Sequence, residues 1–567
     1  MAYKIGVSSG WWKIERPPEL LGIPMKVGGF GATLGTDFIQ VDLETTSEFY
    51  EPQLKERVMR LKKELGMEMG LHAEIGEMTS LESGERRIWE QSHIRLCETV
   101  KNAAELGMVF INMHMSHSLQ MYQREPQLKP FGHTYQVVDP YGKPLKYLAE
   151  SSPHAKAELM KHMTPRAGVY DEDVFEKKMG ALKQEAGKNI ESDFNNYLNS
   201  RDYKDIKTQY DAAVSSGRLS NELAQAELAR IAGVEREKIT YRWDRWLQQQ
   251  QYNPEFLYEA WKESRFGQYF IEWGEIGAYF VVAAHMHGSG DPLWTAVCNG
   301  KDPTDAYSFN QPGFNAAVAM RYIEGHLTAN NEINKKILGG KTILQWLNEK
   351  KLYLNFEIPE IDQPGMEGLS RLYNPLDFYH LVKKLGSPFV KICIDFEHMI
   401  SNKMEPEKII SSAPGDFGKY VNLFHLGKPI PYFGTAHAQI PVPSRSMEIL
   451  YKWLYMMRQK GFADGYMIYE RGSGKNPQEV VQKSVLALRN IAENLGKGIA
   501  PVELPETFYG ISEQNKDMFA RQLTAVREHA WDPLTGLLVR PEETHTFRSR
   551  TAVEKGKAEE WKRARFR

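Results

Sequence analysis

Cysteine is scarce in this 567-residue chain, which contains only Cys97, Cys298 and Cys393. They are isolated in the sequence, so they form neither a disulfide framework nor a zinc-knuckle pattern. Long apolar runs are missing as well, since no stretch approaches the roughly 20 residues that a helix needs to span a bilayer. The first residues, MAYKIGVSSG, lack the basic start, apolar core and cleavage site of a signal peptide. We therefore expect a reducing, cytoplasmic setting and no membrane partner.

A large charge of one sign is missing too. The chain has 71 Lys and Arg against 73 Asp and Glu, a formal net charge of -2 and a pI near 6.8. The strongly basic surface that is typical of nucleic-acid-binding proteins is therefore absent at the level of the whole chain. The exception is segment 546–567, which has eight Lys or Arg against three Glu. We expect a solvated, partly helical tail there, and the alternative is a segment that binds DNA, another phosphate-rich polymer or a protein partner.

Short runs rich in Val, Ile, Phe and Leu recur along the chain, and their near-continuous apolar character is typical of parallel strands buried on both faces. They are residues 4–9, 37–44, 68–75, 108–116, 351–358, 389–397, 420–427 and 465–472. Segments with a helical period alternate with them, at 51–65, 85–106, 376–385, 447–459 and 477–495. Gly66, Gly107 and Gly386 stand where helix C-terminal caps would be. Eight strands alternating with helices predict an α/β protein with a (β/α)8 TIM barrel.

The spacing between the fourth and fifth expected strands is unusually long for a barrel, which predicts an insertion. We divide the chain into a first half of the barrel (1–117), a mostly helical insertion (118–312), a second half of the barrel (313–500) and a C-terminal extension (501–567). Within the insertion, 171–265 is charged and helix-prone, whereas 270–284 is more apolar and is expected to pack back on the barrel. An insertion that follows a barrel strand begins at the catalytic end, so it could form a lid or a wall of the site. An oligomerisation module is the alternative.

Nearly every expected strand ends in a side chain that can bind a metal ion. In chain order these are His72, His114, Glu357, Asp395, His425 and Glu470, with His398 and His437 just beyond the sixth and seventh strands. The carboxyl ends of barrel strands meet in one ring, where these groups would repel one another or stay unsatisfied without cations. Imidazole and carboxylate ligands without a thiolate suit Zn²⁺ or Mn²⁺, and Fe²⁺ is compatible. More than three ligands allow two ions, which can activate water and stabilise the entering and leaving oxygens of a reaction.

Each of these residues also has an ordinary structural interpretation. A single histidine at a strand end is commonly a hydrogen-bonded core residue, Asp395 could cap the next helix, and Glu357 could neutralise an arginine. Six strand ends would have to satisfy such interpretations by coincidence, so we favour a shared metal site. His117 and Glu397 are expected to orient ligands, and His117 is also a candidate for substrate binding. The alternating pair His285 and His287 is weak support for a metal site, and we leave it out of the predicted ligands.

The stretches INMHMSHSL, LNFEIPE, KICIDFEHM, NLFHLGK and YMIYERGSGKNP resemble the xylose-isomerase-like TIM barrels, and most closely the endonuclease IV type of apurinic endonuclease (AP endonuclease family 2). The resemblance covers residues 1–117 and 313–500. It implies zinc bound by His72, His114, Glu357, Asp395, His398, His425, His437 and Glu470, with Glu357 in a bridging position. That family uses three zinc ions to nick the backbone beside abasic sites.

The chain departs from this family near His437. The family has an aspartate two residues before the matching histidine, and this chain has Thr435. A third ion would keep only His398 and His437 as ligands, so the resemblance implies two ions and leaves a third in doubt. The Asn-Asp pair that follows His-Leu in many relatives is Gly427-Lys428 here.

Three functions are consistent with this pattern. The leading prediction is a metal-dependent hydrolase, a phosphodiesterase that acts on abasic or damaged DNA at the barrel mouth. Its catalytic carboxylates would be Glu357, Asp395 and Glu470, and Lys428 and Arg471 are candidates for holding the phosphate, although both could be ordinary surface cations.

The alternative is a metal-dependent isomerase or epimerase of a small sugar or phosphorylated substrate, in which Glu357 and Glu470, expected on nearly opposite sides of the barrel, serve the proton transfer. The near-neutral net charge favours this alternative. The third function is a scaffold without catalysis, whose insertion binds partners.

Overall fold

The computed structural model describes residues 3–9, 22–27, 36–43, 46–73, 80–115, 138–161, 163, 171–264, 281–285, 290–298, 312–360, 372–429, 439–441, 444–470 and 477–509. Within this part of the chain, no helix combines the length and the apolar character needed to cross a bilayer. The basic segment 546–567 lies outside the described residues.

Eight parallel strands form a closed barrel in chain order, with β1 paired to both β2 and β8. The strands are β1 (Tyr3–Ser8), β2 (Phe38–Asp42), β3 (Glu68–His72), β4 (Phe110–Met113), β5 (Tyr353–Glu357), β6 (Val390–Asp395), β7 (Val421–Leu426) and β8 (Gly465–Tyr469). Each lies within or overlaps one of the eight predicted runs. The predicted (β/α)8 barrel is therefore confirmed.

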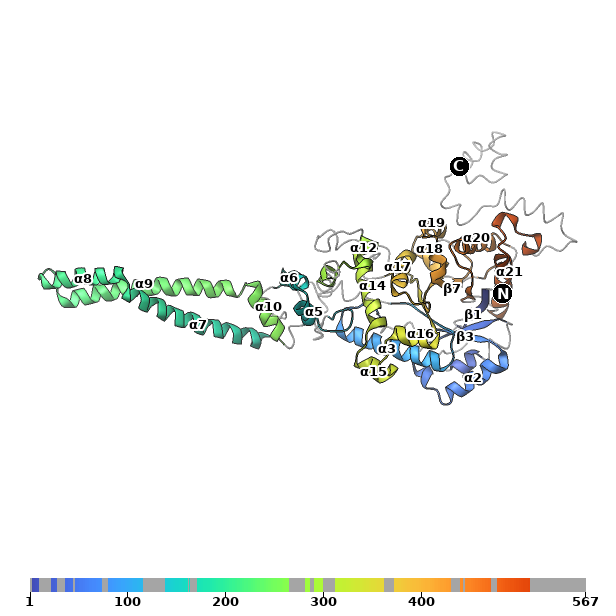
Figure 1. Ribbon diagram of the computed structural model, residues 1–567, viewed down its shortest axis with the longest axis horizontal. Coiled ribbons are helices and arrows are strands. Elements are labelled where there is room, and N and C mark those ends of the chain that lie inside the picture. Colours follow the sequence, from blue (N-terminus) through green and yellow to red (C-terminus); the bar gives the residue numbers. More distant parts are fainter. Residues whose placement is uncertain are drawn as a thin grey trace, which may run out of the picture.

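Helices surround the barrel, as Figure 1 shows for its outer layer. They include α2 (Leu54–Leu65), α3 (Arg86–Glu105), α17 (Pro375–Leu385), α18 (Phe396–Ser401), α19 (Pro406–Ser412), α20 (Arg445–Gln459) and α21 (Pro477–Lys497). Short 3-10 helices are found at Thr46–Tyr50, Phe417–Tyr420, Pro501–Glu503 and Glu506–Tyr509. Gly66, Gly107 and Gly386 have φ values of 63°, 68° and 63°, so they adopt the left-handed conformation that ends helices at the predicted positions.

The barrel interior changes from apolar to polar along the strands. Near the amino ends, the rings of Phe38, Phe110 and Tyr466 pack with centroids 5.0–5.9 Å apart. Two residues beyond Phe38 and Phe110, the buried amides Gln40 and Asn112 follow, and Asn355 of β5 is in register with Asn112. Because strand side chains alternate between faces with a period of two, the next inward positions are the strand ends. The ionisable side chains therefore stand above an apolar floor.

The described residues of the long connection between β4 and β5 form helices of the outer layer, further helices that precede them in the chain, and a projecting arm. Helices α14 (Pro312–Thr328), α15 (Glu332–Leu338) and α16 (Ile343–Lys350) pack around α3 and α17 in the layer outside the barrel. Helices α5 (Leu145–Ser151), α6 (Pro153–Lys161), α10 (Pro254–Glu263) and α12 (Pro292–Cys298) lie before them in the chain. The described residues of this connection are mostly helical, and the insertion with its boundaries at 118 and 312 stays a prediction.

A second hydrophobic core joins this connection to the barrel. Trp261 and Trp294 pack there with Trp89 of α3 and Phe314 of α14, all almost fully buried. Val281, Val282 and Ala283 belong to the same core, whereas the rest of the apolar segment 270–284 that precedes them lies outside the described residues. The described end of that segment therefore packs against helices of the outer layer.

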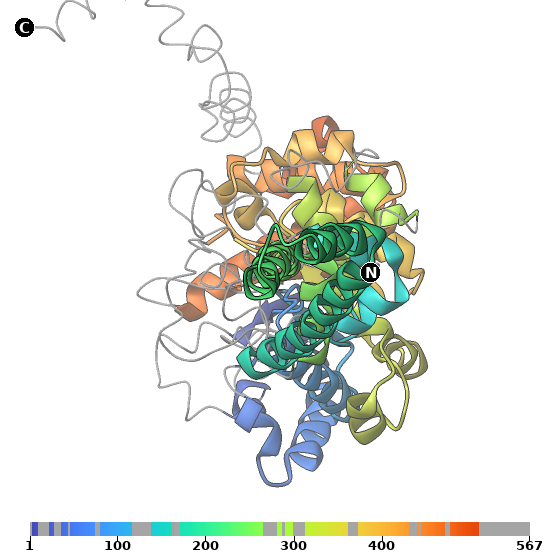
Figure 2. The ribbon, with the colours of Figure 1, turned by 90° about the vertical axis from the view of Figure 1, so that its left-hand side faces the viewer.

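A helical arm extends away from the barrel, as Figure 1 shows at its left. It consists of α7 (Glu172–Asn199), α8 (Arg201–Ser215) and α9 (Asn221–Gln250), and Figure 2 looks along it toward the barrel. Helices α7 and α9 pack side by side, and α8 packs against both. A helix of about 30 residues is roughly 45 Å long. The arm points away from the barrel, so its tip does not form the lid that the sequence allowed.

Candidate metal centre

Glu357, the last residue of β5, lies at the middle of the predicted ligands and is fully buried. Its Oε2 lies 3.1 Å from His72 Nε2 and 3.5 Å from His114 Nε2. Its Oε1 lies 3.1 Å from His425 Nδ1 and 3.6 Å from His398 Nδ1. Imidazoles that come from four other segments of the chain therefore meet at one carboxylate.

Among the residues that the structure describes, the possible ligand atoms form two overlapping groups, each with its atoms within 4.8 Å of one another. The first group is His72, Glu357, His425 and Glu470, and the second is Glu357, Asp395 and His398. Glu357 belongs to both groups, and His114 borders them through its contact with Glu357. This arrangement could hold two neighbouring divalent ions that share Glu357 as a bridge.

The end of β6 explains why Asp395 can serve both folding and binding. Its Oδ1 accepts hydrogen bonds from the backbone N–H groups of Glu397 (2.6 Å) and His398 (3.1 Å), and so caps α18. Its Oδ2 faces His398 Nε2 at 3.7 Å. The ordinary interpretation as a helix cap is therefore correct for one oxygen, while the other oxygen remains with the possible ligand group.

The buried carboxylates of the centre are stabilised by positive charge on the neighbouring histidines. Burial would raise the pKa of Glu357, but His114, His425 and His72 hold that pKa well below its usual range. Burial would lower the pKa of His398, but Asp395, Glu357 and Glu470 raise it to about 9. In the protein without metal, protons on such histidines therefore supply the charge that the carboxylates need.

The donor set fits divalent cations by its chemistry. Neither ligand group contains a thiolate, and each combines carboxylate with imidazole, which suits Zn²⁺, Mn²⁺ or Fe²⁺. The choice of zinc among these stays a prediction.

His114 differs from the other histidines of the centre, because burial lowers its pKa to about 4. A neutral imidazole is the form that binds a metal ion.

His425 connects the two carboxylates that were expected on nearly opposite sides of the barrel. Its Nδ1 lies 3.1 Å from Glu357 Oε1 and 3.3 Å from Glu470 Oε2. Glu470 directly follows β8 and its side chain is 17% exposed, whereas Glu357 and His425 are not exposed at all. The two carboxylates therefore reach the same atom, although they come from strands that are not neighbours.

The sequence analysis missed several residues that contact the centre or its ligands, among them three polar residues of β2 and β4. Gln40 Oε1 lies 3.1 Å from His425 Nε2, and the Nδ2 of Asn112 donates to Glu357 Oε2. Asp42 ends β2 and acts on the charge of His72. The signal that could have found them is the two-residue period, because Gln40 and Asp42 share a face of β2, and Asn112 precedes His114 by two residues.

The remaining predicted site residues are not tested by the structure or do not belong to the ligand groups. His117, His437 and Arg471, together with Thr435, lie outside the described residues, so these predictions are untested. Lys428 follows β7, is half-buried and belongs to neither ligand group. For Glu397, the described contact with Asp395 is made by its backbone N–H.

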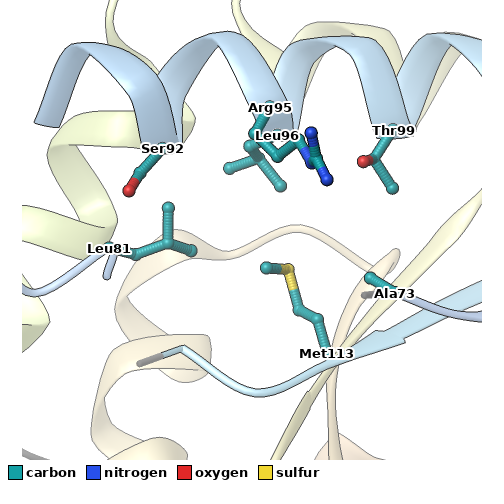
Figure 3. Close-up of a pocket in the computed structure, with 7 residues that line it drawn as sticks. All are labelled: Ala73, Leu81, Ser92, Arg95, Leu96, Thr99 and Met113. Atoms are coloured by element: carbon teal, nitrogen blue, oxygen red, sulfur yellow. The ribbon is translucent and has the colours of Figure 1, made fainter. Parts of the chain in front are cut away.

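A small cavity lies between α3 and the ends of β3 and β4 (Figure 3). It is lined by Ala73, Leu81, Ser92, Arg95, Leu96, Thr99 and Met113. Ala73 and Met113 are neighbours in the chain of His72 and His114. With a volume of about 10 Å³ the cavity has room for about one water molecule. It is therefore too small to be a substrate site.

No protein-family model matches this sequence, and no curated protein matches it. Among solved structures, the chain is similar to a D-psicose 3-epimerase crystallised in the presence of D-fructose, with 11% identity, a TM-score of 0.38, and coverage of 87% of this chain and 99% of that chain. It is also similar to a D-tagatose 3-epimerase-like protein (10% identity, TM-score 0.38, 88% and 100%) and to an L-ribulose 3-epimerase (9% identity, TM-score 0.38, 88% and 98%).

Similarity at these identities and TM-scores carries no argument about activity. The predicted resemblance to the endonuclease IV type is not confirmed by these matches, and neither is hydrolase activity. The barrel is established by its own strand pairing. What the residues themselves establish is a closed (β/α)8 barrel with a buried cluster of imidazoles and carboxylates at the carboxyl ends of its strands, arranged so that it could hold divalent metal ions.

Proposed function

We propose that this chain is a divalent-metal-dependent isomerase or epimerase of a small polyhydroxylated substrate such as a sugar. The observation that carries the proposal is the placement of two carboxylates, Glu357 and Glu470, against one nitrogen of His425 within a deeply buried ligand cluster. Moving a proton between two positions of a carbon skeleton needs such closely placed acid and base groups.

The ligand cluster favours a small substrate by its burial. The side chains of Glu357 and His425 are not exposed, those of His72 and His398 are 6% and 9% exposed, and the most exposed member, Glu470, reaches only 17%. The net charge of -2 also gives no general attraction for a polyanion. A small uncharged or singly phosphorylated molecule is compatible with both properties.

In such a reaction, different residues of the centre would bind the metal ions, transfer the proton and exclude water. Divalent ions bound by the two ligand groups would polarise neighbouring oxygens of the substrate. Glu470, whose side chain is the more exposed of the two, would take a proton from the carbon beside a carbonyl group. Glu357 Oε1 lies against the same His425 atom, and because its pKa is held well below its usual range it would stay ionised as a metal ligand. The proton returned to the substrate would then be the one that Glu470 has just taken. The apolar floor formed by Phe38, Phe110 and Tyr466 keeps water from reaching the intermediate from below.

A phosphodiesterase remains the second candidate, and one observation favours it. His72 and His114 both approach Glu357 Oε2, at 3.1 and 3.5 Å, so imidazoles are available on both sides of the bridging carboxylate. A pair of ions with such ligands could stabilise the attacking and leaving oxygens of a phosphate ester. DNA binding at the barrel mouth or by segment 546–567 belongs to this second candidate.

Hydrogen exchange tests the two candidates side by side. The protein loaded with Zn²⁺ or Mn²⁺ is incubated in D₂O with ketoses, aldoses and their phosphates, and NMR follows deuterium entering carbon positions. We expect exchange and interconversion that are lost with a chelator, in Glu357→Gln and in Glu470→Gln. Asn355→Ala is the control, because it changes another buried barrel amide outside the ligand groups. Cleavage of an oligonucleotide with an abasic site, without exchange into any sugar, would contradict the proposal in favour of the phosphodiesterase.

A further inference from the structure

Gln40 lies inside the barrel, on the same face of β2 as Asp42, and is fully buried. Both atoms of its side-chain amide have polar neighbours. Oε1 lies 3.1 Å from His425 Nε2, and Nε2 lies 3.4 Å from Asp42 Oδ1. Gln40 therefore connects a carboxylate on one side with a predicted metal ligand on the other.

Asp42 determines which way the amide of Gln40 points. A carboxylate only accepts hydrogen bonds, so the NH₂ group of Gln40 faces Asp42 and its carbonyl oxygen faces His425. Asp42 is itself held in place. Its Oδ2 accepts from the hydroxyls of Ser8 (2.5 Å) and Ser9 (3.3 Å), and its backbone oxygen accepts from Lys26 Nζ (2.6 Å).

The orientation of Gln40 in turn selects the protonated nitrogen of His425. Gln40 Oε1 can only accept, so Nε2 of His425 carries the hydrogen and donates it. The Nδ2 of Asn112 also lies near Nε2, at 3.3 Å, but an NH₂ group cannot accept a hydrogen, and it donates to Glu357 Oε2 instead. Nδ1 of His425 faces the carboxylates of Glu357 and Glu470, so without a metal ion it carries a hydrogen as well. It is the nitrogen at which a metal ion would replace that hydrogen.

We propose that Asp42 and Gln40 are positioning residues that fix His425 with its hydrogen on Nε2 and with Nδ1 directed into the metal centre. The role rests on the proposed function, since it presupposes that His425 binds a metal ion there. Groups that hydrogen-bond the second nitrogen of a ligand histidine fix its ring and commonly change metal affinity by about 10–100-fold. The alternative is that Gln40 only fills the barrel interior.

Titration of the metal-free protein with Co²⁺, followed by the absorption bands of the bound ion, separates these two roles. We expect Gln40→Met, which keeps the volume and removes the acceptor, to weaken Co²⁺ binding by about 10–100-fold. The double variant Gln40→Glu with Asp42→Asn restores an acceptor for His425 and a donor for that acceptor, so it should recover most of the affinity. Asn355→Ala, which removes a buried amide that contacts Asn422 and none of the ligands, should bind Co²⁺ as the wild type does.

The same titration can also contradict the positioning role of Gln40. Wild-type affinity in Gln40→Met, or an equal loss in Asn355→Ala, would mean that Gln40 is merely structural. If Gln40→Met does not fold, ¹⁵N NMR of the His425 ring in the wild type decides, because a hydrogen on Nδ1 with none on Nε2 would contradict the proposal. Co²⁺ binding needs no substrate, so a protein that binds the ion but shows no sugar exchange would contradict the proposed reaction and leave the positioning role standing. A wild type that binds no Co²⁺ would overturn both.

Discussion

Around Glu357, imidazoles from four segments of the chain meet a carboxylate that no solvent reaches. A buried carboxylate is costly unless opposite charge accompanies it. In the protein without metal, that charge comes from protons on the histidines, and the pKa directions of Glu357 and His398 express it. A divalent cation would supply the same charge without those protons, which links metal binding to pH.

A substitution at Asp395 can separate its effect on metal binding from its effect on the stability of the fold. In Asp395→Asn, the amide oxygen can still cap α18 by accepting from the N–H groups of Glu397 and His398, so we expect a loss of stability within about 1 kcal/mol. The negative charge beside His398 disappears, and the second ligand group should bind its ion at least about 10-fold more weakly. Thermal unfolding and Co²⁺ titration of the same sample measure the two effects. A variant that loses its stability and keeps its metal would contradict this division of roles.

His398 gives the metal-free protein a characteristic pH dependence. Burial alone would lower its pKa, but Asp395, Glu357 and Glu470 raise it to about 9, whereas in the unfolded chain it is about 6.5. Its stabilising contribution is therefore complete below pH 6.5 and is lost as the pH rises through 9. We expect the Tm of the metal-free protein to fall by several degrees between these values.

His398→Asn serves as the comparison in that experiment, because it removes the titrating ring. Its Tm should change less over the same pH range than that of the wild type. Equal slopes in the two proteins would show that His398 is not the group responsible. Metal affinity should rise over this range, since binding displaces the proton.

The residues of the buried cluster could be predicted from the sequence because most of them end an apolar run, and the topology of a barrel brings such ends together. Gln40 and Asn112 could not be found in that way, because a neutral amide inside an apolar strand carries no charge to attract notice. Asp42 is the last residue of β2, so the same reasoning applies to it. The closeness of Glu357 and Glu470 could not be predicted either, because it depends on side-chain length and direction across the barrel.

At the scale of the elements, the strands close around an aromatic floor that leaves no space at two glycines. A Cβ added at Gly70 of β3 would lie 2.1 Å from the ring of Phe110, and one at Gly6 of β1 would lie 2.5 Å from the ring of Phe38. In both pairs, the glycine on one strand is in register with the aromatic residue on the next. The glycines are therefore needed for close packing and not for an unusual backbone conformation.

Gly70→Ala is expected to destabilise the barrel by about 1–3 kcal/mol, because the floor cannot accept another methyl group without moving a ring. Gly187→Ala in α7, where nothing lies within 4 Å, is the matched control and should be neutral or stabilising by up to about 1 kcal/mol. Urea unfolding measures both. Adding Phe110→Leu to Gly70→Ala should cost less than the sum of the single changes, and strict additivity would contradict the proposed clash.

The element boundaries could be predicted to within a few residues where a glycine marks the end of a helix. Gly66 and Gly386 end α2 and α17 where expected, because only glycine adopts the left-handed conformation without strain. The expected strand runs were longer than the strands that form, since apolar residues continue into the loops. Residues 351–358, for example, contain β5 only at Tyr353–Glu357.

At the scale of the whole molecule, the arm is the feature that the sequence described least. Its charge and helix propensity predicted helices, but not that α7 and α9 pair into a projection directed away from the barrel (Figure 1). Both helices are polar on most of their surface, and Met179, Ala186, Ala224 and Ile239 are their buried residues. An amphipathic pattern shows that a helix has a partner, but not where the pair points.

Because the arm packs mainly on itself, its removal should leave the barrel intact. We expect a variant in which a short Gly/Ser linker replaces residues 172–250 to keep the barrel fold, with a helical circular-dichroism signal smaller by the contribution of α7, α8 and α9. We also expect a Tm within a few degrees of the full chain and unchanged Co²⁺ affinity. Light scattering of both proteins also tests the predicted role of the insertion in oligomerisation, which would make only the full chain associate. Loss of metal binding on removal of the arm would show that the arm supports the centre.

The central claim, that distant strand ends form one metal centre, is tested most directly by anomalous X-ray diffraction from crystals of the metal-loaded protein. We predict one anomalous peak between Glu357, His72, His425 and Glu470, and a second beside Glu357, Asp395 and His398. The absence of any peak within bonding distance of Glu357, or peaks only at other places on the molecule, would contradict the account.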